Sequence, residues 1–186
     1  MKRAVLLLAL LMSAAPAQAD PAHETGFAAA LRGCEAWALQ PASWNDGPGP
    51  FLAAIGLGNR VTSLAKVPPS ALPPPELRRG LKHWKVPVSP KAGFVLTVSD
   101  ALPICHVVGQ GEGDFASSIE AVIASPEFAA RWEKLEDLPS PSGVSSTSFR
   151  SREEPKFTLT LSRRLDVPPE TRAVKVIATA IYDPGS

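Results

Sequence analysis

The sequence predicts an α+β domain in which an antiparallel sheet of about five strands is covered by two main helices. Three observations lead to this fold class. Apolar residues recur at helical spacing in two separate segments, they alternate with period two in later segments, and short turns join the predicted strands as hairpins. No strand–helix–strand alternation and no internal repeat is visible, which argues against a parallel sheet.

The first predicted helix starts at Gly26 or Phe27, is capped by Thr25, and stops after Leu39 because Pro41 follows. The segment is rich in alanine, the best helix former. Its core-facing residues fall three or four positions apart and form one stripe: Phe27, Leu31, Cys34 and Ala38.

Between this helix and the sheet, the chain alternates turns with short elements. A turn at 45–50 precedes one or two helical turns at 51–57, and residues 61–64 predict a short strand. The proline-rich connection 67–75 contains five prolines, which have no backbone N–H to donate. We therefore expect an extended polyproline conformation there rather than a helix. A short helical turn over 76–81 follows.

Three strands are predicted near the middle of the chain. Residues 83–88 fit an edge strand that Pro87 ends or blunts. Residues 94–98 are apolar on both faces, which is typical of a strand inside a sheet. Across a turn at 99–103, residues 104–109 form its hairpin partner.

A glycine-rich loop over 109–114 leads into the second helical segment. It is similar to phosphate-binding turns, but Asp114 stands in place of the third glycine of G-x-G-x-x-G and suits a helix N-cap instead. Ser125 and Pro126 restart the helix, so one kinked helix or two abutting helices are expected before Pro139. The apolar face consists of Phe115, Ile119, Val122, Ile123, Phe128, Trp132 and Leu135.

The C-terminal part combines a flexible loop with further strands. The loop, 139–148, is small and polar, although residues 144–150 also fit a hairpin partner for the next strand. Residues 157–162 alternate strictly between apolar and polar, which predicts a half-buried strand. A last strand is expected over 174–182.

Residues 1–19 have the three parts of a cleavable signal peptide. The pair Lys2-Arg3 precedes an apolar run over 4–12, and Ala17-Gln18-Ala19 supplies the small residues of a cleavage site. The run is shorter than the roughly 20 residues that span a bilayer. We therefore expect one domain over 20–186, in a mature protein that is periplasmic or secreted.

Charge and export argue against a nucleic-acid partner. Cleavage after Ala19 leaves 17 basic and 18 acidic residues, a net charge of −1, which is not the footprint of a nucleic-acid binder. Arg78-Arg79 and Arg163-Arg164 are expected on solvated faces. No segment suits a membrane span, and we expect an unidentified protein or small ligand of the cell envelope as the partner.

Cys34 and Cys105 are the two cysteines, and in an exported protein an even count predicts one disulfide. The alternative is a nucleophilic Cys105 beside His106. Neighbours on a strand point to opposite faces, however, which leaves His23 and His83 as bases. The spacing of cysteines and histidines is not that of a zinc site, so neither metal nor cofactor is expected.

Two function classes remain. The first is a non-catalytic binding or interaction module, in which Trp37, Trp84 and Trp132 line a groove. The second is a small periplasmic hydrolase that uses Cys105 or a serine with a histidine. We favour the first and assign no catalytic residue, because no credible acid–base pair or nucleophile stands out.

Three motifs occur in a fixed order along the chain. An N-terminal helix carries one cysteine, a strand carries the second in Pro103-Ile104-Cys105-His106-Val107, and the next helix contains Phe128-x-x-x-Trp132. This order is similar to that of small exported proteins of unknown function from Gram-negative bacteria. The resemblance implies export and paired cysteines, and brings no catalytic residues.

Overall fold

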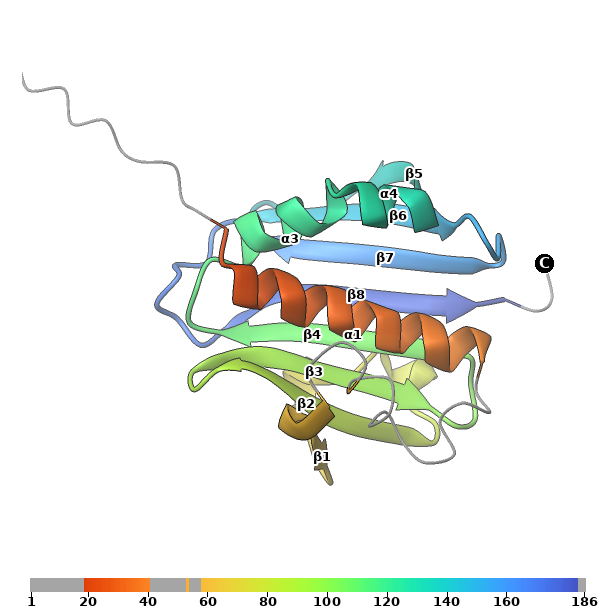
Figure 1. Ribbon diagram of the computed structural model, residues 1–186, viewed down its shortest axis with the longest axis horizontal. Coiled ribbons are helices and arrows are strands. Elements are labelled where there is room, and N and C mark those ends of the chain that lie inside the picture. Colours follow the sequence, from red (N-terminus) through yellow and green to blue (C-terminus); the bar gives the residue numbers. More distant parts are fainter. Residues whose placement is uncertain (1–18, 41–52, 54–57, 184–186) are drawn as a thin grey trace, which may run out of the picture.

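The computed structural model describes residues 19–40, 53 and 58–183. The elements in chain order are α1 (Pro21–Leu39), η2 (Gly58–Arg60), β1 (Thr62–Leu64), η3 (Pro69–Ala71), η4 (Pro75–Leu77), β2 (Leu81–Ser89), β3 (Ala92–Ser99), β4 (Ile104–Gly111), α3 (Phe115–Ile123), α4 (Pro126–Arg131), β5 (Trp132–Leu138), β6 (Val144–Ser151), β7 (Phe157–Arg164) and β8 (Val174–Tyr182). In this part of the chain, one antiparallel sheet carries the helices on one face (Figure 1). The predicted α+β class is confirmed, but the sheet has eight strands rather than about five. The predicted turn at 45–50 lies outside the described residues, as does nearly all of the predicted helix at 51–57.

The sheet consists of two four-stranded meanders that meet at their last strands. The strand order is β1-β2-β3-β4-β8-β7-β6-β5, and β4 pairs with β8 so that Val107 lies opposite Ala178. Each meander follows a helix in the chain: α1 precedes β1 to β4, and α3 with α4 precedes β5 to β8 (Figure 1). We call these the first and second halves. They share one topology, a repeat that the sequence does not show.

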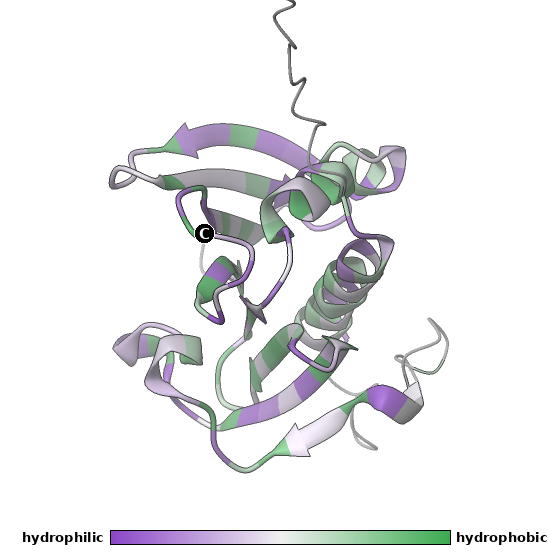
Figure 2. Cartoon of the chain, turned by 90° about the vertical axis from the view of Figure 1, so that its left-hand side faces the viewer, coloured by the Kyte–Doolittle hydropathy of each residue, from purple (hydrophilic) through white to green (hydrophobic). Residues whose placement is uncertain are grey.

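The inner face of the sheet carries the helices, and Figure 2 shows the sheet bending around them. Because α1 lies against β2, β3 and β4, its predicted stripe is buried at Phe27, Leu31 and Cys34. Trp37 extends the same buried side of the helix. The helical spacing therefore identified the face that meets the sheet.

The start of α1 differs from the prediction. The helix begins at Pro21, because the carboxylate of Asp20 accepts a hydrogen bond from the backbone N–H of Ala22 at 2.9 Å. Asp20 thus takes the N-cap role expected of Thr25, and proline at the first position suits a helix start.

The outer face is covered in the first half by the connection between β1 and β2. Ala71 in this connection is fully buried and packs with Val95 of β3 and Val108 of β4. Every residue of β3 is therefore buried, as its two-faced apolar run predicted.

Two features of this region correct the predictions. The proline-rich connection contains a 3-10 turn at Pro69–Ala71 rather than extended chain alone. Proline is tolerated there because the donors come later in the turn, as when Ala71 N–H donates to the carbonyl of Pro68 at 2.9 Å. Strand β2 is not the edge strand predicted for 83–88, since β1 pairs with its free side.

The largest correction concerns Trp132–Leu138, which form the edge strand β5 instead of extending the helix to Pro139. Helix α4 ends at Arg131. Pairing with β6 turns the Trp132 ring into the core, whereas Leu135, expected on an apolar helix face, is 44% exposed. The prediction failed because a strand partner outweighs helical spacing.

Other expectations for the second half are met. Asp114 accepts from Ser117 N–H and Ser125 from Phe128 N–H, so α3 and α4 are two abutting helices with the expected caps. β6 begins at Val144 and pairs with β7, which shortens the predicted flexible loop 139–148. β7 has the alternating burial of a half-buried strand.

Candidate functional site

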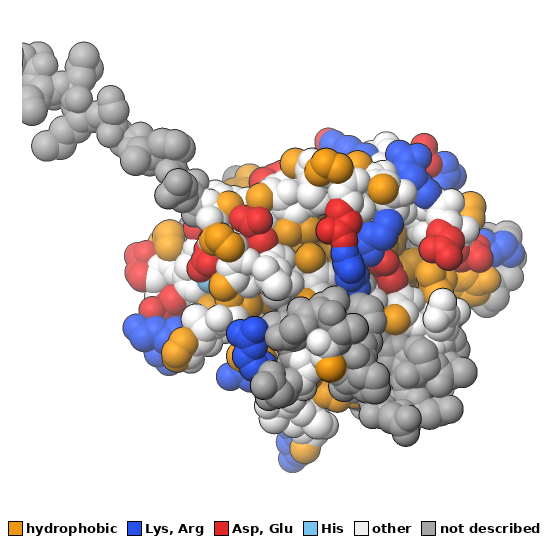
Figure 3. Space-filling model, viewed as in Figure 1, with side chains coloured by type: hydrophobic (Ala, Val, Ile, Leu, Met, Phe, Trp, Pro, Cys, Tyr) orange, Lys and Arg blue, Asp and Glu red, His pale blue; other side chains and the backbone are white. Residues whose placement is uncertain are grey.

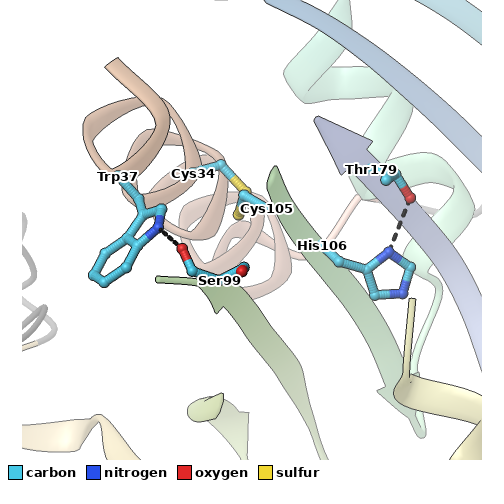
Figure 4. The surroundings of a disulfide bond; sticks show 6 residues. All are labelled: Cys34, Trp37, Ser99, Cys105, His106 and Thr179. Carbon is cyan, nitrogen blue, oxygen red and sulfur yellow. Dashed lines mark hydrogen bonds between the residues drawn. A yellow bond between two sulfur atoms is a disulfide. The ribbon is translucent and has the colours of Figure 1, made fainter. Parts of the chain in front are cut away.

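Cys34 of α1 and Cys105 of β4 form a disulfide, with their Cα atoms 5.2 Å apart (Figure 4). The predicted bond is confirmed, and it ties the first helix to a central strand. Both residues are buried. Cys105 in this state has no thiol to act as a nucleophile.

His106 points to the face of β4 opposite Cys105 (Figure 4). Its Nδ1 lies 2.9 Å from Oγ1 of Thr179, and its Nε2 has no hydrogen-bond partner in the part of the chain that the structure describes. Burial lowers the pKa of His106 to about 4, so the ring is neutral at pH 7. The side chain is thus a buried member of the outer face.

The other two histidines are also engaged in the fold. His83 Nδ1 lies 2.8 Å from Oγ1 of Thr97, and burial lowers the pKa of His83. His23 Nδ1 lies 2.8 Å from a carboxylate oxygen of Asp20, and its ring meets the edge of Phe115. Neither ring makes a hydrogen bond to a serine hydroxyl among these contacts.

The three tryptophans expected in a groove are buried in the inner core. The structure brings Trp37 and Trp84 together, with ring centroids 6.3 Å apart. Trp132 lies elsewhere, against Phe128 and Phe157. These side chains contribute to packing, and the hollow described below is lined by other residues.

A group of paired charges joins α1 to α4. Arg131 pairs with Glu35, which also accepts a hydrogen bond from Trp132 Nε1 at 2.9 Å, and Arg32 pairs with Glu127. Figure 3 shows acidic and basic side chains gathered in this region of the surface. Burial raises the pKa of Glu35, and the Arg131 charge opposes that rise. The charges satisfy one another, which fits a structural clasp.

Arg163 corrects the expectation of a solvated arginine pair. Arg163 is only 5% exposed. Its guanidinium pairs with Glu120 of α3 and donates hydrogen bonds to the hydroxyls of Ser145 and Thr147 of β6. Burial lowers the pKa of Arg163. Arg163 therefore fastens α3 to the second half, whereas Arg164 is exposed as predicted.

A hollow of about 440 Å³ opens on the outer face, at the end of the sheet where the β2–β3 turn lies. Residues 92–95 of β3 form part of its lining, together with Leu64 at the end of β1, Pro68 from the following segment and Pro90 from the turn. Gln110 and Gly111 at the end of β4 also line it, as do four cationic side chains: Lys66, Lys85, Lys91 and Arg172. We call this hollow the basic pocket.

The cations of the basic pocket differ in their partners. The carboxylate of Glu112 accepts a hydrogen bond from Lys91 Nζ at 3.0 Å and lies 3.7 Å from Arg172 Nε. The hydrogen bond from Lys91 lowers the pKa of Glu112. Lys66 and Lys85 have no acidic partner among the described residues. Four cations against one carboxylate leave the pocket positive, which favours an anionic ligand.

The glycine-rich loop contributes to this pocket without forming a phosphate-binding turn. Gly111 lines the hollow, but the N–H of Glu112 donates to the Lys91 carbonyl and that of Gly113 to the Pro169 carbonyl. Lys175 Nζ also donates hydrogen bonds to the carbonyl oxygens of Gly113 and Pro169, at 2.9 and 2.8 Å. These amides are already bonded, so side-chain cations rather than backbone donors give the pocket its charge.

Sequence reasoning missed the basic pocket. Its cations come from the segment after β1, from β2, from the following turn and from the loop before β8, so no local spacing links Lys66 to Arg172. Lys85 carries the one local signal: it follows Trp84 on a strand, so its side chain lies on the opposite face from that buried ring.

Within the described residues, no group of three or more histidine, cysteine, aspartate or glutamate side chains is placed to hold a metal ion. No helix in the same ranges has the length and apolar character needed to cross a membrane.

The fold and site thus define an α+β domain with a disulfide-tied first half and a positively charged hollow on its outer face. Comparisons with protein-family models, with curated proteins and with solved structures found no match to this chain.

Proposed function

We propose that this chain is an exported, non-catalytic binding module that holds a small anionic ligand of the cell envelope in the basic pocket. The observation that carries the proposal is the lining of that pocket: within the described part of the chain Lys66 and Lys85 have no acidic partner, and Lys91 and Arg172 share a single carboxylate. An excess of cationic side chains beside a hollow favours an anionic ligand.

The chemistry of the remaining residues supports binding rather than hydrolysis. A hydrolase needs a nucleophile within hydrogen-bond reach of a base. Cys105 is bonded to Cys34, and His106 and His83 contact threonine hydroxyls on the outer face. No contact of these groups favours the hydrolase alternative.

Export is part of the proposal and rests on the sequence of residues 1–19. Its test is the intact mass of the protein recovered from the periplasm of an expressing bacterium. We expect a chain that starts at Asp20 and whose cysteines react with iodoacetamide only after reduction. A mass that includes residues 1–19 would overturn the export proposal.

Binding is tested with a charge series of small aromatic probes: phenyl phosphate, benzylammonium and benzyl alcohol. Amide chemical shifts of Gly93 and Gly111, which line the pocket, report on each titration. We expect phenyl phosphate alone to move them. Equal responses to all three probes, or a response to benzylammonium only, would contradict an anion site.

A matched pair of double variants locates the site. Lys66→Gln with Lys85→Gln removes the two unpaired cations and should weaken phenyl phosphate binding about tenfold, because each exposed ion pair contributes about threefold. Lys82→Gln with Lys134→Gln removes equal charge at exposed positions outside the pocket and should change it less than about twofold. Equal losses in both variants would show a diffuse charge effect.

A further inference from the structure

We infer that the ligand of the basic pocket is an amphiphilic anion, with a phosphate or carboxylate head at the cationic rim and an apolar body against the wall. This inference rests on the proposed function and specifies its ligand. The first step is the position of the charges: the residues Lys66, Lys85, Lys91 and Arg172 are exposed, so their cationic ends stand at the mouth.

The second step is the apolar wall of the pocket. Leu64, Pro68 and Val95 line it, and among the described residues no acidic side chain does. Leu64 and Val95 also belong to the small outer cluster that includes Ala71 and Val108. The wall is therefore continuous with an apolar contact between the sheet and its cover, and an apolar body lying there would bury surface that water now reaches.

The third step is the small size of that contact. Among the described residues, the outer cluster has three buried members, whereas the inner core contains many aromatic and aliphatic side chains. Leu64 and Val67 pack against the outer cluster while only partly buried, so this segment offers apolar surface that an alkyl chain or ring can contact. Inorganic phosphate would use the rim and leave this wall unused.

The experiment is a homologous series of soluble alkyl phosphates, from methyl through butyl to hexyl, measured by calorimetry. We expect the affinity to rise about threefold for each added methylene until the wall is covered. A flat series would overturn the amphiphile while leaving anion binding intact. Absence of binding by every member and by phenyl phosphate would overturn the proposed function itself.

Two single variants separate the head from the body. Leu64→Ser should reduce the gain in affinity per methylene and leave the affinity for methyl phosphate unchanged. Leu165→Ser, which replaces an exposed leucine outside the pocket, is its control. Glu112→Gln should tighten binding of every member about threefold, because it removes the carboxylate that now occupies Lys91 and Arg172. Weaker binding in Glu112→Gln would overturn the assignment of the rim.

The same head and body occur in free alkyl phosphates and in membrane lipids. Sedimentation with phosphatidylcholine vesicles that contain phosphatidate distinguishes these sources. If the wild type binds to the vesicles and the double variant Lys66→Gln with Lys85→Gln binds less, the ligand is a lipid. Binding to soluble hexyl phosphate without vesicle binding would indicate a free amphiphile. Either result supports the inference, and failure of both probes overturns it.

Discussion

The two halves of the molecule share a topology but differ on the outer face. In each half, three outer-face residues lie side by side across the last three strands. In the first half they are Lys85, Val95 and Val108, and in the second they are Ser148, Thr160 and Thr179. The first row thus consists of a cation and two apolar residues, whereas the second consists of three residues with hydroxyl groups.

The difference teaches how one sheet can serve two purposes. The connection between β1 and β2 covers part of the first half, so β3 is buried on both faces and a hollow forms beside the cover. The second half has half-exposed hydroxyl side chains on its outer face, such as Ser146 and Ser162, whose oxygens lie 2.8 Å apart. A covered face provides a place for a ligand, whereas an open hydroxyl face remains hydrated.

The disulfide gives the largest expected difference between the halves, because it ties α1 to β4, whereas the sequence of the second half contains no cysteine. Replacing both cysteines, Cys34→Ala with Cys105→Ala, frees a loop with a sequence separation of 71 residues. We expect the free energy of unfolding to fall by about 4 kcal/mol, measured by urea denaturation. A fall below about 1 kcal/mol would show that packing alone holds α1.

The next prediction concerns His106, which lies on the outer face of β4 opposite Thr179 of β8. Its pKa is about 4 in the fold and near 6.5 in the unfolded chain. Between these values the unfolded chain binds a proton that the folded chain does not, so stability falls as pH drops from about 6.5 to 4, by about 3 kcal/mol at most.

The test is the pH dependence of urea unfolding for wild type and His106→Gln. The wild type should lose more stability than the variant between pH 7 and 4. Carboxylates with lowered pKa values, such as Asp114, also lose stabilisation at the acid end of this range, but they do so in both proteins. Parallel curves for the two proteins would contradict a buried neutral imidazole.

A reciprocal exchange sharpens the contrast between the outer faces. Val95→Thr places a hydroxyl among buried apolar side chains and should destabilise the protein by about 2 kcal/mol. Thr160→Val, at a half-exposed outer-face position of β7, should change stability by less than about 0.5 kcal/mol. Equal effects of the two substitutions in thermal unfolding would show that the cover does not bury the first half.

The smallest expected effects come from the two aspartate caps, Asp20 of α1 and Asp114 of α3. Replacing either with alanine should cost about 1 kcal/mol, because an N–H at the helix start loses its acceptor. Asparagine at either position retains an acceptor and serves as the control. A loss in the asparagine variants equal to that in the alanine variants would assign the effect to charge rather than capping.

The successful predictions are those in which neighbours in sequence decide the structure. The stripe of α1, the caps Asp114 and Ser125 and the alternation in β7 follow from short-range periodicity and side-chain acceptors. The failures lie where a distant partner intervenes. Trp132 joins a strand because β6 is beside it, and Arg163 is buried because α3 supplies Glu120.

The sequence by itself determined the α+β class, the antiparallel character of the sheet and the pairing of Cys34 with Cys105, since periodicity and a count of two cysteines carry that information. Tertiary structure alone decided that the strands form two matching meanders and that Lys66, Lys85 and Arg172 surround one hollow. The physical reason is that strand pairing and pocket assembly join residues far apart in the chain, and their energies depend on partners that no local window contains.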